Sequence, residues 1–74
     1  MKIQKIIGEN GAMPQLCGRA ACPAAILADT GDVFVQGYIP APEDGTALTA
    51  PTGESFVRMS RTTFEKIARQ VLAS

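Results

Sequence analysis

Residues 24–39, AAILADTGDVFVQGYI, hold two apolar runs separated by a short polar segment that contains a glycine. Both runs contain residues that favour β-strands, and the Thr30-Gly31 step between them is typical of a tight turn. This pattern predicts a β-hairpin. Alternation along the second strand divides its side chains between two faces. One face carries Val33, Val35, Gly37 and Ile39, and the other carries Phe34, Gln36 and Tyr38.

The valine face is expected to be the core face of this hairpin. A glycine in the middle of a strand marks either a bulge or a close approach of another backbone, so Gly37 is predicted to serve one of these purposes. Phe34 and Tyr38 then lie on the opposite face of the sheet.

Further elements are expected on both sides of the hairpin. Residues 2–7, KIQKII, are predicted to form a short strand that ends at the turn signal GENG, and residues 55–60, SFVRMS, a second strand. Residues 12–23 show no sustained period and are predicted to be a connection. Residues 40–54 contain three prolines and two glycines, which predicts a long exposed loop.

The segment RTTFEKIARQVLAS, residues 61–74, carries the clearest helical pattern. Its apolar residues recur at i, i+3, i+4, i+7 and i+8 and form one stripe: Phe64, Ile67, Ala68, Val71 and Leu72. Ser60 is suited to the N-cap, while Thr62 with Glu65 offers an alternative capping box.

The expected fold is therefore α+β. A small antiparallel sheet of three to four strands carries one C-terminal amphipathic helix packed on one face, in a single domain over residues 1–74. The helix stripe is expected to pack on Val33, Val35 and Val57.

The formal net charge is zero, which argues against broad electrostatic binding to nucleic acid. The charges are segregated along the chain. Residues 20–57 hold five acids and no base, whereas Arg58, Arg61, Lys66 and Arg69 follow with one acid, Glu65. Either an ordinary solvated surface or a dipolar surface that orients a charged partner fits this pattern.

The first residues, MKIQKIIGENG, lack the apolar core of a signal peptide. No apolar run approaches the roughly 18 residues that a membrane span needs. We therefore expect a cytoplasmic protein without a membrane partner, in a compartment where thiols stay reduced.

The two cysteines, Cys17 and Cys22, lie close together in CGRAAC. Free thiols, a local disulfide and a metal shared between two chains are all compatible with this spacing. Structural zinc normally requires four Cys or His ligands, and the sequence has two Cys and no His. A catalytic cysteine or serine likewise lacks a histidine base.

Other polar motifs have structural explanations. Asp29 and Asp32 bracket the hairpin turn, where aspartate is common for reasons of geometry, and GENG lacks the spacing of a phosphate-binding loop. We therefore predict no catalytic residue, no metal site, no cofactor and no enzymatic activity. The strand–helix pattern of residues 55–72 also fits the start of a ribbon-helix-helix fold, with Arg58 contacting DNA, but that fold requires a second helix.

A cysteine before a strand, a glycine turn, the VFVQGY strand and an FVRMS strand leading to a capped helix with Phe64 follow one another over residues 22–72. This arrangement resembles the small actinobacterial accessory regulators of the BldB-like and WhiJ-associated kind, which lie beside helix-turn-helix transcription factors. The resemblance implies a small cytoplasmic protein that acts by binding a regulator. No functional residue is transferred from it.

One helix cannot cover both faces of the expected sheet, so Phe34 and Tyr38 should need a partner. We predict a homodimer or a complex with a protein partner, such as a helix-turn-helix regulator, rather than a nucleic-acid partner. The predicted partner-binding residues are Phe34, Gln36, Tyr38, Phe56 and Arg58. Folding of residues 1–22 over the same face would instead leave a monomer. The alternative functions are a small DNA-binding protein and an antitoxin.

Overall fold

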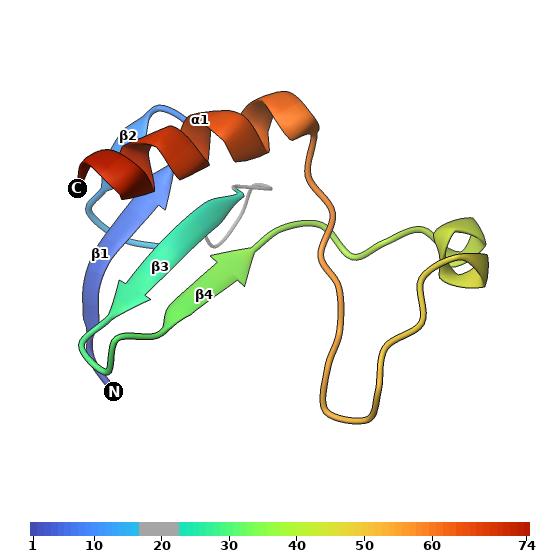
Figure 1. The fold of residues 1–74 in the computed structure, drawn as a ribbon. Coiled ribbons are helices and arrows are strands. Elements are labelled where there is room, and N and C mark those ends of the chain that lie inside the picture. The colour runs from blue at the N-terminus through green and yellow to red at the C-terminus, as the bar shows by residue number, and fades with distance from the viewer. Residues whose placement is uncertain (17–22) are drawn as a thin grey trace.

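The structure is a computed structural model that describes residues 1–16 and 23–74. These residues form one antiparallel sheet with an α-helix across one of its faces (Figure 1), so the predicted α+β class is confirmed. The elements are β1 (Ile3–Gly8), β2 (Gly11–Met13), β3 (Ala24–Ala28), β4 (Val33–Gln36), the 3-10 helix η1 (Pro42–Thr46) and α1 (Arg61–Ala73).

The sheet has the strand order β2-β1-β3-β4. The predicted hairpin is confirmed as β3 and β4, which pair with Ala25 opposite Val35. Its turn contains Gly31 at a φ of 89°, a conformation that glycine adopts without steric cost. Strand β4 ends at Gln36, before the predicted end at Ile39.

Strand β2 is not predicted by the sequence, which indicates only a connection after residue 11. In the structure GENG forms the turn of a second hairpin, in which Gly8 lies opposite Gly11. The β2 strand has three residues, GAM, too few to show an alternating pattern. Residues 3–13 therefore extend the sheet. The monomer alternative required this segment to fold over the face of the sheet that carries Phe34, and it does not.

The predicted strand over residues 55–60 is wrong. Within the described residues, this segment pairs with the sheet at a single bridge, where Tyr38 and Arg58 exchange backbone hydrogen bonds of 2.8 and 2.7 Å. The predicted close approach at Gly37 is confirmed. A Cβ atom on Gly37 would lie 3.0 Å from the Arg58 carbonyl oxygen and 3.2 Å from the Val57 Cβ. The backbone of residues 57–58 passes close to Gly37, and a side chain at position 37 would collide with it.

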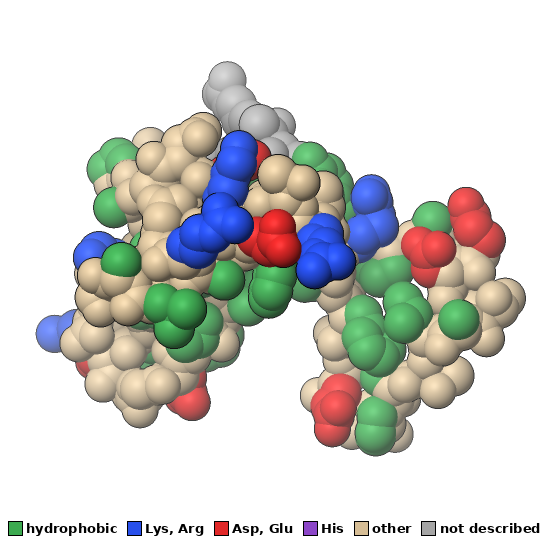
Figure 2. Space-filling view, turned by 45° about the horizontal axis from the view of Figure 1, so that its top comes forward, with side chains coloured by type: hydrophobic (Ala, Val, Ile, Leu, Met, Phe, Trp, Pro, Cys, Tyr) green, Lys and Arg blue, Asp and Glu red, His purple; other side chains and the backbone are tan. Residues whose placement is uncertain are grey.

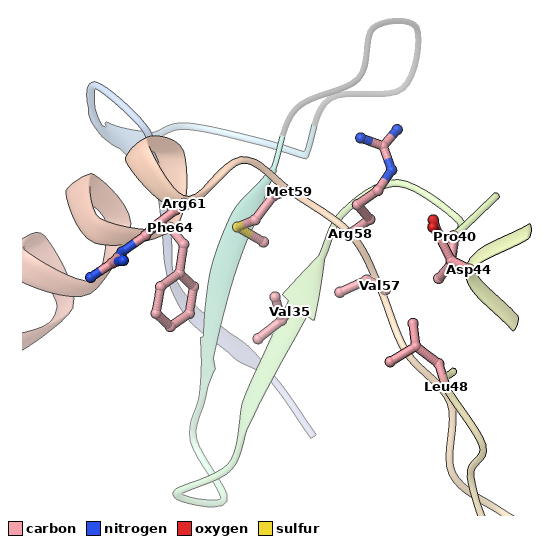
Figure 3. A pocket seen from close by; sticks show the side chains of 9 residues that line it. All are labelled: Val35, Pro40, Asp44, Leu48, Val57, Arg58, Met59, Arg61 and Phe64. Carbon is pink, nitrogen blue, oxygen red and sulfur yellow. The ribbon is translucent and has the colours of Figure 1, made fainter. Parts of the chain in front are cut away.

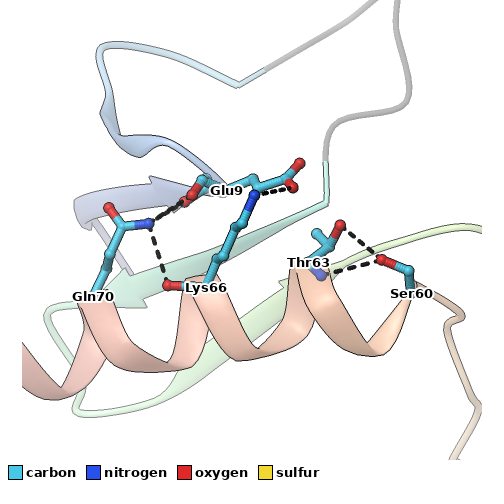
Figure 4. Close-up of polar contacts among 6 residues, drawn as sticks. Glu9, Ser60, Thr63, Lys66 and Gln70 are labelled. Atoms are coloured by element: carbon cyan, nitrogen blue, oxygen red, sulfur yellow. Dashed lines mark hydrogen bonds and ion pairs between the residues drawn. The ribbon is translucent and has the colours of Figure 1, made fainter.

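Helix α1 begins at the predicted N-cap. The Ser60 hydroxyl oxygen accepts a hydrogen bond of 3.1 Å from the Thr63 backbone N–H (Figure 4). The alternative capping box is not formed, because Thr62 lies inside the first turn of α1; Glu65 pairs with Arg61 at 3.2 Å.

Replacing Ser60 by Ala is expected to lower the free energy of unfolding by about 1 kcal/mol, because the Thr63 N–H then loses its acceptor. Thr62→Ala is the matched control, since Thr62 does not cap the helix, and its effect should stay within about 0.5 kcal/mol. Urea denaturation of both variants measures the difference. Equal losses would show that the Ser60 cap does not stabilise the helix.

Contacts with the β1–β2 turn fix the position of α1 on the sheet. The Gln70 side-chain amide donates to the backbone carbonyls of Gly8, at 3.1 Å, and Glu9, at 2.8 Å (Figure 4). The Lys66 ammonium lies 3.3 Å from the Glu9 carboxylate. These contacts draw the helix towards β1 and β3, the strands on which it packs.

The core lies beneath this position. On the helix face, Ile67 of α1 is buried, and Ile7 and Ala25 are buried as a cross-strand pair of β1 and β3. The opposite face has its own apolar cluster: Ile6, Ala24 and Ile26, with Met13 packed against them.

The prediction that α1 packs on Val33, Val35 and Val57 as its core is wrong. Val33, Val35 and Val57 are all exposed, as is Ile39, because α1 does not extend over β4. The sequence identifies the correct helix face of the strand but not the strands that the helix covers. No helix in the described part of the chain is long and apolar enough to cross a bilayer.

Candidate protein-interaction site

An apolar groove runs between β4 and α1, with a volume of about 290 Å³. We call it the β4–α1 groove. Only apolar residues line it: Ala25, Val33, Val35, Met59, Phe64, Ile67, Ala68, Val71 and Leu72.

The groove exists because α1 is rolled away from β4. At 100° per residue, the apolar stripe of α1 is about 140° wide, with Ile67 at one margin and Leu72 at the other. The Gln70 contacts hold the Ile67 margin against the sheet, and Ile67 is 5% exposed. The other margin is left without cover, so Leu72 is 87% exposed, and Phe64, near the centre of the stripe in the first turns of α1, is 56% exposed.

Two valines form the floor of the groove. Val33 and Val35 point to the helix side of β4, and their exposed fractions are 54% and 49%. A groove bordered by large, half-exposed apolar side chains is typical of a surface that binds another protein. The sequence patterns of the strand and the helix identify these apolar residues. From the patterns alone, however, they are predicted to form a closed core and not an open groove.

A second hollow, of about 470 Å³, continues the groove past the end of β4 (Figure 3). It shares Val35, Met59 and Phe64 with the groove. In Figure 3 the charged ends of Arg58 and Arg61 point away from the apolar side chains at its centre. The apolar surface is therefore continuous from α1 to the residues beyond β4.

Residues 40–57 form an arm that projects from the sheet and helix (Figure 1). The predicted exposed loop is confirmed in outline, since η1 has no buried residue, although the 3-10 helix itself is not predicted. Its Asp44 carboxylate accepts a hydrogen bond of 3.2 Å from the Ala41 N–H. The arm displays Leu48, Phe56 and Val57 as exposed apolar side chains.

The structure brings the five predicted partner-binding residues together only in part. Tyr38 and Arg58 form the bridge at the base of the arm, and the Arg58 guanidinium carbon lies 5.1 Å from the centre of the Tyr38 ring. Phe34, 46% exposed, and Gln36 lie on the β4 face opposite α1. Phe56 is separate, because it lines a hollow formed within the arm.

Charges are grouped on different parts of the surface. The basic side chains of α1 lie along its outer face, whereas the arm displays acidic ones (Figure 2). At the start of β4, the exposed Asp32 carboxylate accepts a hydrogen bond of 2.8 Å from the Thr30 hydroxyl, a local turn contact. Asp29 accepts one of 2.9 Å from the Lys2 N–H. Both aspartates thus have structural contacts at the hairpin.

The described residues do not form a metal site, because nowhere among them do three His, Cys, Asp or Glu side chains gather closely enough. Cys17 and Cys22 lie outside the described residues. No family model, curated protein or solved structure matches the chain. The chemistry of the groove, which is apolar and open, is therefore the guide to function.

Proposed function

We propose that this chain is a non-enzymatic protein-interaction domain that binds an apolar helix of a transcription regulator in the β4–α1 groove. The observation that carries the proposal is the continuous apolar lining of the groove, in which Val33, Val35, Phe64 and Leu72 stay about half exposed or more. Covering these side chains removes apolar surface from water, which favours association.

The chemistry of the lining supports a helical ligand in particular. The lining side chains provide no hydrogen-bonding group for the backbone of an extended peptide. A helix satisfies its own backbone hydrogen bonds and presents apolar side chains at i, i+3, i+4 and i+7, as in other helix-in-groove complexes. The two valines on the floor, beside the apolar side chains of α1, form an apolar surface on which such side chains can pack.

The resemblance to small accessory regulators supports a helix-turn-helix transcription factor in the cytoplasm as the source of this helix. Sequencing the neighbouring genes, followed by a calorimetric titration of the chain with a helix-turn-helix regulator encoded there, tests the proposal. We expect saturable binding. The absence of binding, together with tight DNA binding that weakens steeply as salt rises, would overturn the proposal in favour of a DNA-binding function.

A pair of variants tests whether the groove is the binding surface. Phe64→Gln with Leu72→Gln is expected to weaken binding roughly thirtyfold, because both apolar groups on the rim are lost. Thr62→Gln with Ala73→Gln places the same residues on the exposed outer face of α1 and should leave affinity unchanged. Equal affinity for both double variants would exclude the groove. Circular dichroism checks that each variant keeps its helix.

A further inference from the structure

The outer edge of β4 is open. Among the residues that the structure describes, Val33–Gln36 pairs with β3 alone. The Ala28 N–H donates to the Asp32 carbonyl at 3.0 Å, which sets the alternation of the ladder. Val33 and Val35 therefore occupy non-hydrogen-bonded pairs with β3. Their N–H and C=O groups point away from β3, towards the open edge.

This edge lacks the usual protection against pairing. Natural edge strands carry lysine, proline or a bulge, and β4 has the sequence VFVQ with a regular register. Both of its faces display exposed apolar side chains, the valines towards α1 and Phe34 on the opposite face. Such an edge is suited to continue the sheet into another strand.

We propose that β4 pairs antiparallel with β4 of a second copy, about a two-fold axis at Phe34. In this register Val33 lies opposite Val35 of the second copy, and the reverse, so that all the outward backbone groups of both valines form hydrogen bonds. An axis at Val35 would place Val33 opposite Gly37, where the Arg58 backbone already lies close. An axis at Val33 would require pairing with the turn glycine, Gly31.

Charge complementarity favours a second copy as the occupant. Exposed Asp32 lies at the start of β4, and Arg58 is bridged to Tyr38 just past its end. Antiparallel pairing brings the acidic end of one strand beside the basic end of the other, twice. The net charge is zero, so two copies do not repel each other as a whole. The separation of acidic and basic residues along the sequence therefore favours antiparallel pairing of two copies.

Pairing would also complete the binding groove, a step that rests on the proposed function. Neighbouring strands lie about 4.8 Å apart, so α1, placed over β1 and β3, lies roughly 10 Å from the two-fold axis. The two helices are then roughly 19 Å apart on one face of a continuous sheet, a gap that admits one helix of about 10 Å diameter. The two half-grooves merge into one cleft with four valines on its floor.

Cross-linking tests the register in the full chain with Cys17 and Cys22 replaced by Ser. Phe34→Cys is expected to form a disulfide-linked dimer on mild oxidation, because the proposed pair has its Cα atoms about 4.5 Å apart. Val33→Cys is the matched control and should not link to itself, but should link to Val35→Cys in a mixture. Linkage of Val33→Cys alone, with none for Phe34→Cys, would overturn the proposal.

Sedimentation tests assembly without new thiols. The wild type is expected to sediment as a dimer at 100 μM, and Val35→Pro as a folded monomer, because proline removes an outward N–H that β3 does not use. A monomeric wild type that also fails to cross-link through Phe34→Cys would overturn the pairing. A dimer that does not bind the regulator would contradict the proposed function alone. Unchanged regulator affinity in monomeric Val35→Pro would overturn the merged cleft.

Discussion

Replacing Ile67 by Ala is expected to lower the free energy of unfolding by about 3 kcal/mol. Ile67 is the buried residue of α1, and its removal leaves a cavity against the helix face of the sheet. Because a chain of this length has a total stability of about 4–11 kcal/mol, the loss is a large share of it. Urea denaturation followed by circular dichroism measures the change.

Two further positions of the same apolar stripe serve as controls. Leu72→Ala should change stability by no more than about 0.5 kcal/mol, because Leu72 is almost fully exposed. Val71→Ala should fall between the two, since Val71 is half-buried. Equal losses at Ile67 and Leu72 would mean that the helix packs through the centre of its stripe and covers β4.

Replacing Gly37 by Ala is expected to cost about 2 kcal/mol and to open the base of the arm. The new Cβ would meet the Arg58 carbonyl at 3.0 Å, and a backbone atom cannot move aside as the end of a flexible side chain can. Hydrogen exchange should accelerate at the Tyr38 and Arg58 amides, whose bonds form the bridge.

Gly45→Ala is the matched control for this substitution. A Cβ atom at Gly45 meets nothing within 4 Å, so exchange at Tyr38 and Arg58 should stay as in the wild type. If both variants exchange at the same rate, the close approach at Gly37 does not hold the arm.

The features that sequence predicts correctly are those with local signals. The β3–β4 hairpin follows from two apolar runs around a turn glycine, and the start of α1 follows from Ser60. The placement of α1 depends on Gln70 reaching Gly8 and Glu9, some sixty positions earlier, and a polar residue on a helix gives no signal of such a contact. Strand β2 is missed because it has only three residues, too few for a strand pattern, and it pairs with β1 across the turn that Gln70 contacts.

The candidate site is predictable in its residues but not in its exposure. Val33 and Val35 have the alternation of a strand face, and Phe64 and Leu72 have the spacing of a helix face. Both patterns indicate apolar surfaces, and neither indicates which surface meets which. The roll of α1 about its axis decides that Ile67 is buried while Leu72 remains at the rim of the groove.

The Tyr38–Arg58 bridge makes the arm a natural place for chain length to vary. Both ends of the arm are held together at this bridge, and η1 buries none of its residues. Lengthening such a closed loop adds only about 0.6 kcal/mol of entropic cost for each doubling. The turn at Gly53, whose surroundings are open, could therefore accept an inserted epitope or a fluorescent label while β4 and α1 keep their positions.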